Sequence, residues 1–123
     1  MADSPEQRQL AEKMRQIDVL LSHVWMVRTF LKHCEEVEED DELAEVPRGL
    51  YDFMLALGTP LRNNDAEAYL KACRKKWSKF KKTVELYLEI QPEISNHTNF
   101  QMAAASLADA AQSIDDVLQQ VAD

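Results

Sequence analysis

Residues 66–87 read AEAYLKACRKKWSKFKKTVELY and predict a long amphipathic helix. Their apolar positions follow one another at alternating steps of four and three residues, which places them on one helix face. These positions are Ala66, Leu70, Cys73, Trp77, Phe80, Val84 and Tyr87. Such a narrow stripe is typical of a helical bundle, in which neighbouring helices pack along it. Because Asn64 and Glu67 have capping-box spacing, we expect the helix to begin at Asn64 and to end before Pro92.

The segments before and after this stretch carry the same kind of pattern. Between residue 5 and about residue 36, one stripe contains Leu10, Met14, Ile17, Leu21, Val24 and Leu31. Ser4 suits the cap of this helix and Pro5 its first position, where no amide donor is needed. From Thr98, which has capping-box spacing to Gln101, an alanine-rich helix is expected to continue to the end of the chain. Three long helices are therefore expected.

A short helix is expected between the first two long ones. Pro47 would open it, and Gly58 with Pro60 would end it. The preceding residues, about 35 to 46, are expected to form a solvated linker because closely spaced like charges weaken a helix. The sequence therefore predicts an all-α, four-helix up-and-down bundle with a short second helix, built as one domain over residues 1–123.

The composition is that of a globular helical protein. Hydrophobic residues make up 46% and charged residues 29% of the chain, with two glycines and four prolines. No apolar run approaches the roughly 20 residues that a membrane-spanning helix needs. The first residues lack the basic and apolar regions of an export signal, so we expect a cytoplasmic location and no membrane partner. Cys34 and Cys73 are expected to be buried free thiols.

The charged residues are segregated along the chain. Eight acids lie between Glu35 and Glu45, and seven bases lie between Lys71 and Lys82. The predicted basic face consists of Lys71, Arg74, Lys75, Lys79 and Lys82. We expect the acidic segment to dock on this face, in the same chain or in a second copy. Nucleic acid is the weaker alternative, because the net charge is −8 and the aromatic residues that stack on bases lie on the opposite side of the helix.

The first helix carries a second apolar stripe, which steps from Val19 through His23, Met26 and Phe30 to His33. A helix at the surface of a monomer needs only one such stripe. Because the short second helix would also leave one side of the bundle open, we expect a homodimer or a partner helix on this side. The expected partner-binding residues are Val19, His23, Met26, Phe30, Phe53 and Met54.

Arg28 and His33 carry the one candidate for catalysis. Their spacing resembles the Arg-x4-His pattern of the HEPN ribonucleases, which are helical bundles that cut RNA across a dimer interface. The resemblance implies that His33 acts as general base and that Arg28 stabilises the phosphorane charge. The acidic block, which begins two residues after His33, opposes RNA binding there. Apart from this motif, Arg28 falls within the first apolar stripe, where we expect it to snorkel to the surface or to bridge to an acid such as Asp52. The alternative is that Arg28 lines a small anion pocket.

No metal or cofactor site is expected, because the chain contains neither a Glu-x-x-His nor a Cys-x-x-Cys spacing. The sequence therefore favours a non-catalytic protein-interaction or adaptor module that associates with itself. The alternative is a nucleic-acid-linked module that uses the basic third helix, with the Arg28 and His33 ribonuclease as its enzymatic form.

Overall fold

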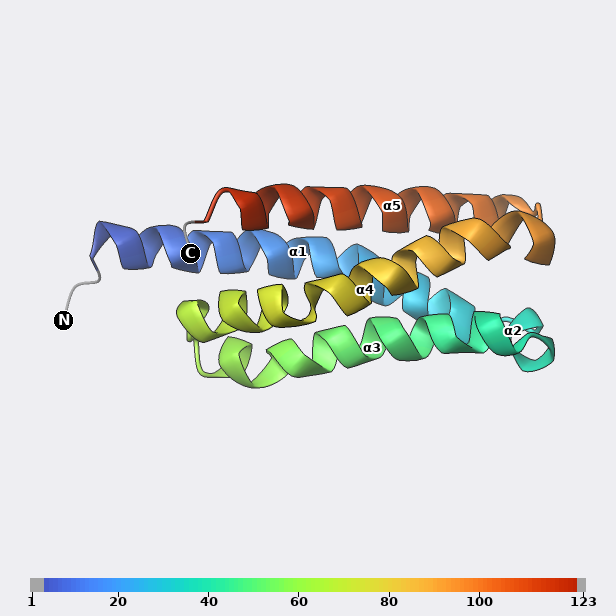
Figure 1. The fold of residues 1–123 in the computed structure, drawn as a ribbon, viewed down its shortest axis with the longest axis horizontal. Helices are drawn as coiled ribbons and strands as arrows, with labels where there is room; N and C mark the ends of the chain where they lie inside the picture. Colours follow the sequence, from blue (N-terminus) through green and yellow to red (C-terminus); the bar gives the residue numbers. More distant parts are fainter. Residues whose placement is uncertain (1–3, 122–123) are drawn as a thin grey trace.

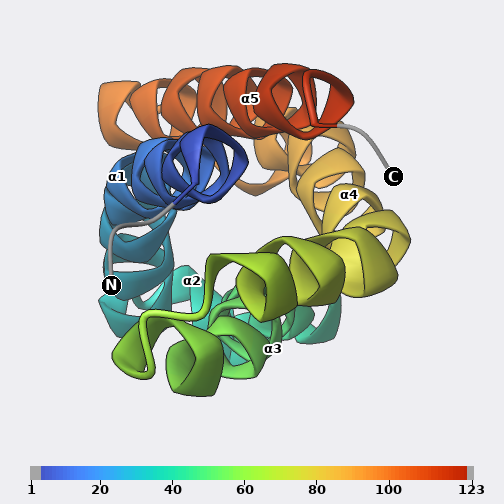
Figure 2. The ribbon, with the colours of Figure 1, turned by 90° about the vertical axis from the view of Figure 1, so that its left-hand side faces the viewer.

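The computed structural model describes residues 4–121, which form five helices and no strand. The helices are α1 (Pro5–His33), α2 (Glu36–Glu39), α3 (Asp41–Arg62), α4 (Ala66–Ile94) and α5 (Thr98–Gln119). The four long helices run alternately in opposite directions (Figure 1). Seen along the bundle, α1 lies beside α3 and α5, and α4 closes the ring between them (Figure 2). The predicted all-α, up-and-down bundle is therefore confirmed.

The second long helix differs most from its prediction. Instead of a short helix from Pro47, α3 has 22 residues and starts at Asp41. The predicted linker is wrong: most of it is the one-turn helix α2 and the first turns of α3. The carboxylate of Asp40 accepts a hydrogen bond from the amide of Leu43 at 2.9 Å, which caps α3. Acids in the first turn also favour the positive end of the helix dipole, so this charge stabilises the helix start.

The prolines do not mark the helix boundaries predicted for them, which were a start at Pro47 and ends near Pro60 and before Pro92. Pro47 and Pro60 lie inside α3, and Pro92 lies inside α4, which continues to Ile94. Pro47 lacks the amide that would donate to the carbonyl of Leu43, but its side chain is buried. The helix passes through it because the apolar stripe of α3 extends to both sides of the proline. Its fully buried members are Leu43, Val46 and Leu50.

Two predicted helix caps are displaced by one residue. At α4, Asp65 rather than Asn64 is the cap, and its carboxylate accepts from the amide of Ala68 at 3.1 Å. Asn64 instead adopts a left-handed φ of 52°, which makes the turn from α3. At α5, His97 takes the place expected for Thr98, with its Nδ1 accepting from the amide of Asn99 at 3.0 Å. The predicted cap Ser4 is confirmed.

The predicted stripes form one core along the bundle. From α1 it contains Met14, Ile17, Leu21, Val24, Val27 and Leu31. The hydroxyl of Tyr87 donates to the carbonyl of Phe100 at 2.9 Å, which links α4 to the start of α5. Phe53 and Phe80 pack with ring centroids 4.3 Å apart between α3 and α4, and Trp77 lies at 5.2 Å from Phe80. The free thiol of Cys73 is buried, whereas Cys34 is half-buried.

Candidate interaction surface

Large exposed apolar side chains gather where α1 lies beside α3. Trp25 and Met26 on α1 are 43% and 65% exposed, and Tyr51 and Leu55 on α3 are 39% and 62% exposed. With the half-buried Met54, we call these five residues the α1–α3 patch. Trp25, Met26 and Met54 line a shallow hollow of about 470 Å³ on this face. The patch therefore joins two helices that are distant in the sequence.

Arg28 lies in the middle of the α1–α3 patch. Its guanidinium carbon is 4.6 Å from the centre of the Trp25 ring and 4.8 Å from the centre of the Tyr51 ring. Trp25 is one turn earlier on α1, whereas Tyr51 comes from α3. Two rings at this distance hold the guanidinium through cation–π attraction.

The predicted bridge from Arg28 to Asp52 does not form. Within residues 4–121, Arg28 has no ion pair, and its Nε is buried without a hydrogen-bond partner. Asp52 instead lines a small hollow with Lys76 and Lys79, on the side of α3 that packs against α4. The aromatic rings, and not a carboxylate, hold this cation in place.

Four of the six expected partner-binding residues lie at the surface. Val19, His23 and Met26 are on the outer face of α1, and Met54 lines the hollow beside Met26. Val19 also lines a second hollow of about 420 Å³ between α1 and α5.

The other two expected residues, Phe30 and Phe53, belong to the packing of the bundle. Phe30 stacks edge-to-face on Phe100 of α5, with ring centroids 5.0 Å apart. Phe53 is only 3% exposed, because it packs against the aromatic residues of α4. Sequence reasoning did not single out the aromatic residues Trp25 and Tyr51. The available signal was the one-turn spacing of Trp25 and Arg28, which suits a stacked pair on one helix.

The lysines of the predicted basic face are exposed, as expected. They are Lys71, Lys75, Lys79 and Lys82. Arg74 differs from them, because it is half-buried and its guanidinium donates to the carbonyls of Leu118 and Val121. These carbonyls lie at the carboxyl end of α5, where cations are stabilised. Arg74 therefore caps α5 and is not part of the open basic face.

The acidic and basic blocks do not meet within the chain. The acids lie on α2 and the start of α3, at the end of the bundle that holds the α4–α5 turn (Figure 1). The lysines lie along α4, where Lys76 and Lys79 line a hollow with Asp52 near the middle of α3. In the described chain, no ion pair joins the two blocks. The predicted docking of the blocks within one chain is therefore wrong.

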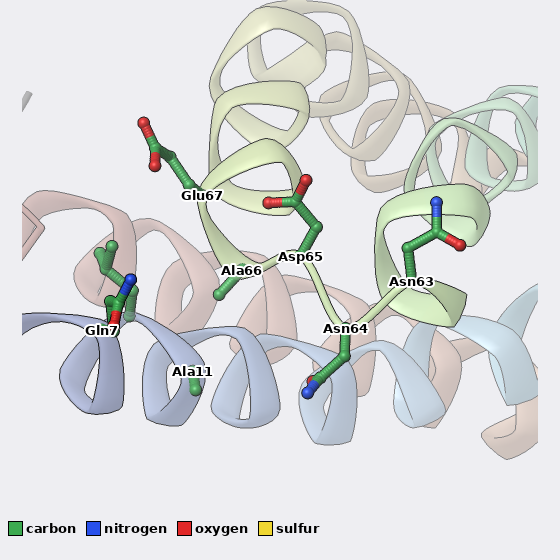
Figure 3. Close-up of a pocket in the computed structure, with 8 residues that line it drawn as sticks. Gln7, Ala11, Asn63, Asn64, Asp65, Ala66 and Glu67 are labelled. Atoms are coloured by element: carbon green, nitrogen blue, oxygen red, sulfur yellow. The ribbon is translucent and has the colours of Figure 1, made fainter. Parts of the chain in front are cut away.

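A polar hollow of about 380 Å³ lies at the turn between α3 and α4, against the first turns of α1. Figure 3 shows Asn64 pointing toward α1, whereas Asp65 and Glu67 point away from it. Asp65 is already engaged in capping α4. The side chains therefore do not converge on a common point, and the hollow is explained by the geometry of the turn.

The structure does not assemble the residues of the predicted ribonuclease motif. Arg28 and His33 are five residues apart, which separates them by about 140° around α1. The guanidinium of Arg28 is covered by two rings, and His33 is exposed at the end of the helix. Burial raises the pKa of the Cys73 thiol to about 12, so this thiol is not an activated nucleophile. Residues 4–121 hold no group of three or more potential metal ligands.

No protein-family model, curated protein or solved structure matches this chain. None of the helices in residues 4–121 combines the length and apolarity that a bilayer-crossing segment requires. A functional conclusion therefore rests on the geometry of the α1–α3 patch and of the charged faces.

Proposed function

We propose that this chain is a non-catalytic protein-interaction module that binds its partner through the α1–α3 patch. The observation that carries the proposal is the stack of Trp25, Arg28 and Tyr51 beside the exposed Met26 and Leu55. Tryptophan, tyrosine and arginine are the residues that dominate the binding energy of protein interfaces, and methionine is enriched there. An isolated exposed apolar residue needs no explanation, but a cluster across two helices does.

The stack also lowers the entropic cost of binding. Immobilising a long side chain at an interface costs about 0.5 to 1.5 kcal/mol. Arg28 is already held against two rings in the free chain, so part of that cost is met before the partner arrives. Burying the exposed part of each apolar side chain of the patch then contributes a fraction of the roughly 1.5 to 3 kcal/mol that full burial supplies.

Self-association belongs to the same proposal. The sequence predicted that a short second helix would leave one side of the bundle open for a homodimer. This side is covered in the structure, because α3 is twice as long as expected and Phe30 packs on Phe100. Val19 remains exposed and lines the hollow between α1 and α5, which supports a self-association surface on α1 beside the α1–α3 patch and separate from it. Light scattering at tens of micromolar protein measures the mass directly, and a monomer under these conditions would leave a different protein as the partner.

The experiment that tests the module compares Leu55→Glu with Met102→Glu in affinity capture from cell extract. Both side chains are similarly exposed, at 62% and 63%, but Met102 lies on α5, outside the patch. We expect a specific partner to be retained by the parent and by Met102→Glu and to be lost by Leu55→Glu. Equal retention by both variants would show that the patch is not the binding surface. Circular dichroism controls for folding.

A further inference from the structure

Resting on the proposed function, we infer that the partner of the α1–α3 patch is an amphipathic segment that places an aspartate or glutamate carboxylate on Arg28. Apolar residues of the same segment would pack on Trp25, Met26 and Leu55. The partner is thereby defined by its chemistry, an acidic side chain flanked by apolar ones at helical spacing.

The first support is the state of the guanidinium. Its central carbon lies over the rings of Trp25 and Tyr51, so cation–π attraction holds it at the surface of the patch. No hydrogen bond to Arg28 is formed within residues 4–121, and only Nε among its side-chain nitrogens is buried. The two terminal nitrogens therefore reach the surface. A fixed guanidinium edge is the geometry that a carboxylate binds with two parallel hydrogen bonds.

The second support is the charge around the patch. Lys32 lies one turn beyond Arg28 on α1, and Arg48 lies one turn before Tyr51 on α3; both are exposed. The acidic block begins only at Glu35, and Glu45 lies one turn before Arg48 on α3. Asp18 is the one acid among the residues that line the hollow, whereas Asp52 lines the other hollow with Lys76 and Lys79. Between Asp18 and Glu35, the charged side chains of α1 are thus the cations Arg28 and Lys32, on a chain whose net charge is −8.

This charge also argues against a second copy on the same patch. A two-fold axis through the patch would place the surface that carries Arg28, Lys32 and Arg48 against itself. Like charges juxtaposed in an interface are unfavourable, whereas an acidic segment is complementary. The partner we infer is therefore a different surface from the patch itself.

The test uses a phage-displayed library of random peptides of about 16 residues, selected on the parent protein and counter-selected on Leu55→Glu. We expect the selected peptides to share an acidic residue with apolar residues three or four positions away. Exchanging that acid for its amide should weaken binding to the parent about tenfold or more. The same exchange should change binding to Arg28→Gln by less than about twofold, because the pair no longer exists. Lys32→Gln is the matched control and should retain most of the amide effect.

The two proposals fail in different ways. If no selected peptide depends on Leu55, the patch is not a docking surface and the proposed function falls with the inference. If peptides depend on Leu55 but need no acid, or lose as much from the amide exchange on Arg28→Gln as on the parent, the docking surface stands and the carboxylate is wrong. If Arg28→Gln does not fold, the same acid-to-amide exchange in the peptide is measured on the parent and on an Arg28→Lys variant. A smaller loss of affinity on Arg28→Lys than on the parent would support the carboxylate contact, and an equal loss would contradict it.

Discussion

The core contains the thiol of Cys73 and the hydroxyls of Tyr69 and Tyr87, and the pKa of each is raised above its value in water. Burial raises the pKa of Cys73 to about 12, and it raises the pKa of the Tyr69 and Tyr87 hydroxyls as well. The Tyr69 hydroxyl has no hydrogen-bond partner within residues 4–121, whereas that of Tyr87 donates to Phe100. These groups belong to the core and make stability sensitive to alkaline pH.

We predict that the free energy of unfolding is level from pH 7 to about pH 8 and falls above about pH 9. A raised pKa means that the unfolded chain releases the proton of Cys73 near pH 9 while the folded chain still holds it. Ionisation then favours the unfolded state, by up to about 1.4 kcal/mol per pH unit for one group. Urea unfolding at half-unit steps measures this dependence. The Cys73→Ala variant should lose less stability between pH 9 and 10, and an identical slope would contradict the assignment.

At the scale of the helices, the contact between α3 and α4 depends on a glycine. A Cβ added at Gly49 would lie 2.5 Å from Oγ1 and 2.8 Å from Cγ2 of Thr83. Gly58, on the same helix, has no atom within 4 Å of such a Cβ. Both positions are helical and gain the same intrinsic propensity from alanine, so they form a matched pair.

We predict that Gly58→Ala stabilises the chain by about 0.5 to 1 kcal/mol, because alanine loses less backbone freedom on folding. Gly49→Ala should instead destabilise it by about 1 to 3 kcal/mol, because Thr83 must be displaced. Chemical denaturation of both variants measures the difference. Adding Thr83→Ala to Gly49→Ala should recover part of the loss, and a stabilising Gly49→Ala would show that the helices separate without cost.

The start of α3 gives a second prediction at this scale. Asp40→Ala should cost about 0.5 to 2 kcal/mol, because it removes the acceptor for the amide of Leu43. Asp41→Ala is the control: it removes an acid of the same first turn that makes no capping bond, and should cost less, about 0.3 to 1 kcal/mol. Denaturant midpoints of the two variants compare them. Equal effects would mean that charge alone, and not the cap, holds the helix start.

At the scale of the molecule, the two charged blocks repel within themselves without neutralising each other. No ion pair joins them in the described chain, and the ion pair of Glu12 with Arg15 lies apart from both, on α1. Salt should therefore screen more repulsion than attraction.

We predict that raising the sodium chloride concentration from about 20 to 200 mM increases the free energy of unfolding by up to about 1 kcal/mol. Each pair of like charges one helical turn apart destabilises a helix by about 0.2 to 0.5 kcal/mol, and salt screens this repulsion. Replacing Glu38 and Glu39 of α2 by glutamine should reduce this increment, because part of the repulsion is then already removed. Thermal unfolding at both salt concentrations provides the measurement. Stability that falls with salt would point to attractive pairs between the blocks.

The part of the candidate site that the sequence could predict was the row of exposed residues along one face of α1. Val19, His23 and Met26 share a face by helical spacing alone, and that spacing holds in the structure. Phe30 and Phe53 could not be assigned in this way, because the same apolar pattern fits a core contact or an open surface. Their burial follows from Phe100 and Phe80, which lie far along the chain and come close only when the helices pack.

The sequence by itself determined the helical class, the up-and-down order and the main core stripes, because apolar residues at steps of three and four can share a face only in a helix. A proline or a run of acids disfavours a helix locally, but burial against other helices can outweigh this effect. Because the sequence alone does not show that burial, the predicted start of α3 at Pro47 was wrong. Only the tertiary structure decided the environment of Arg28. Its Trp25 partner is encoded one turn away, but Tyr51 reaches it from α3, and the two rings hold a half-buried cation that has no carboxylate partner in the described chain.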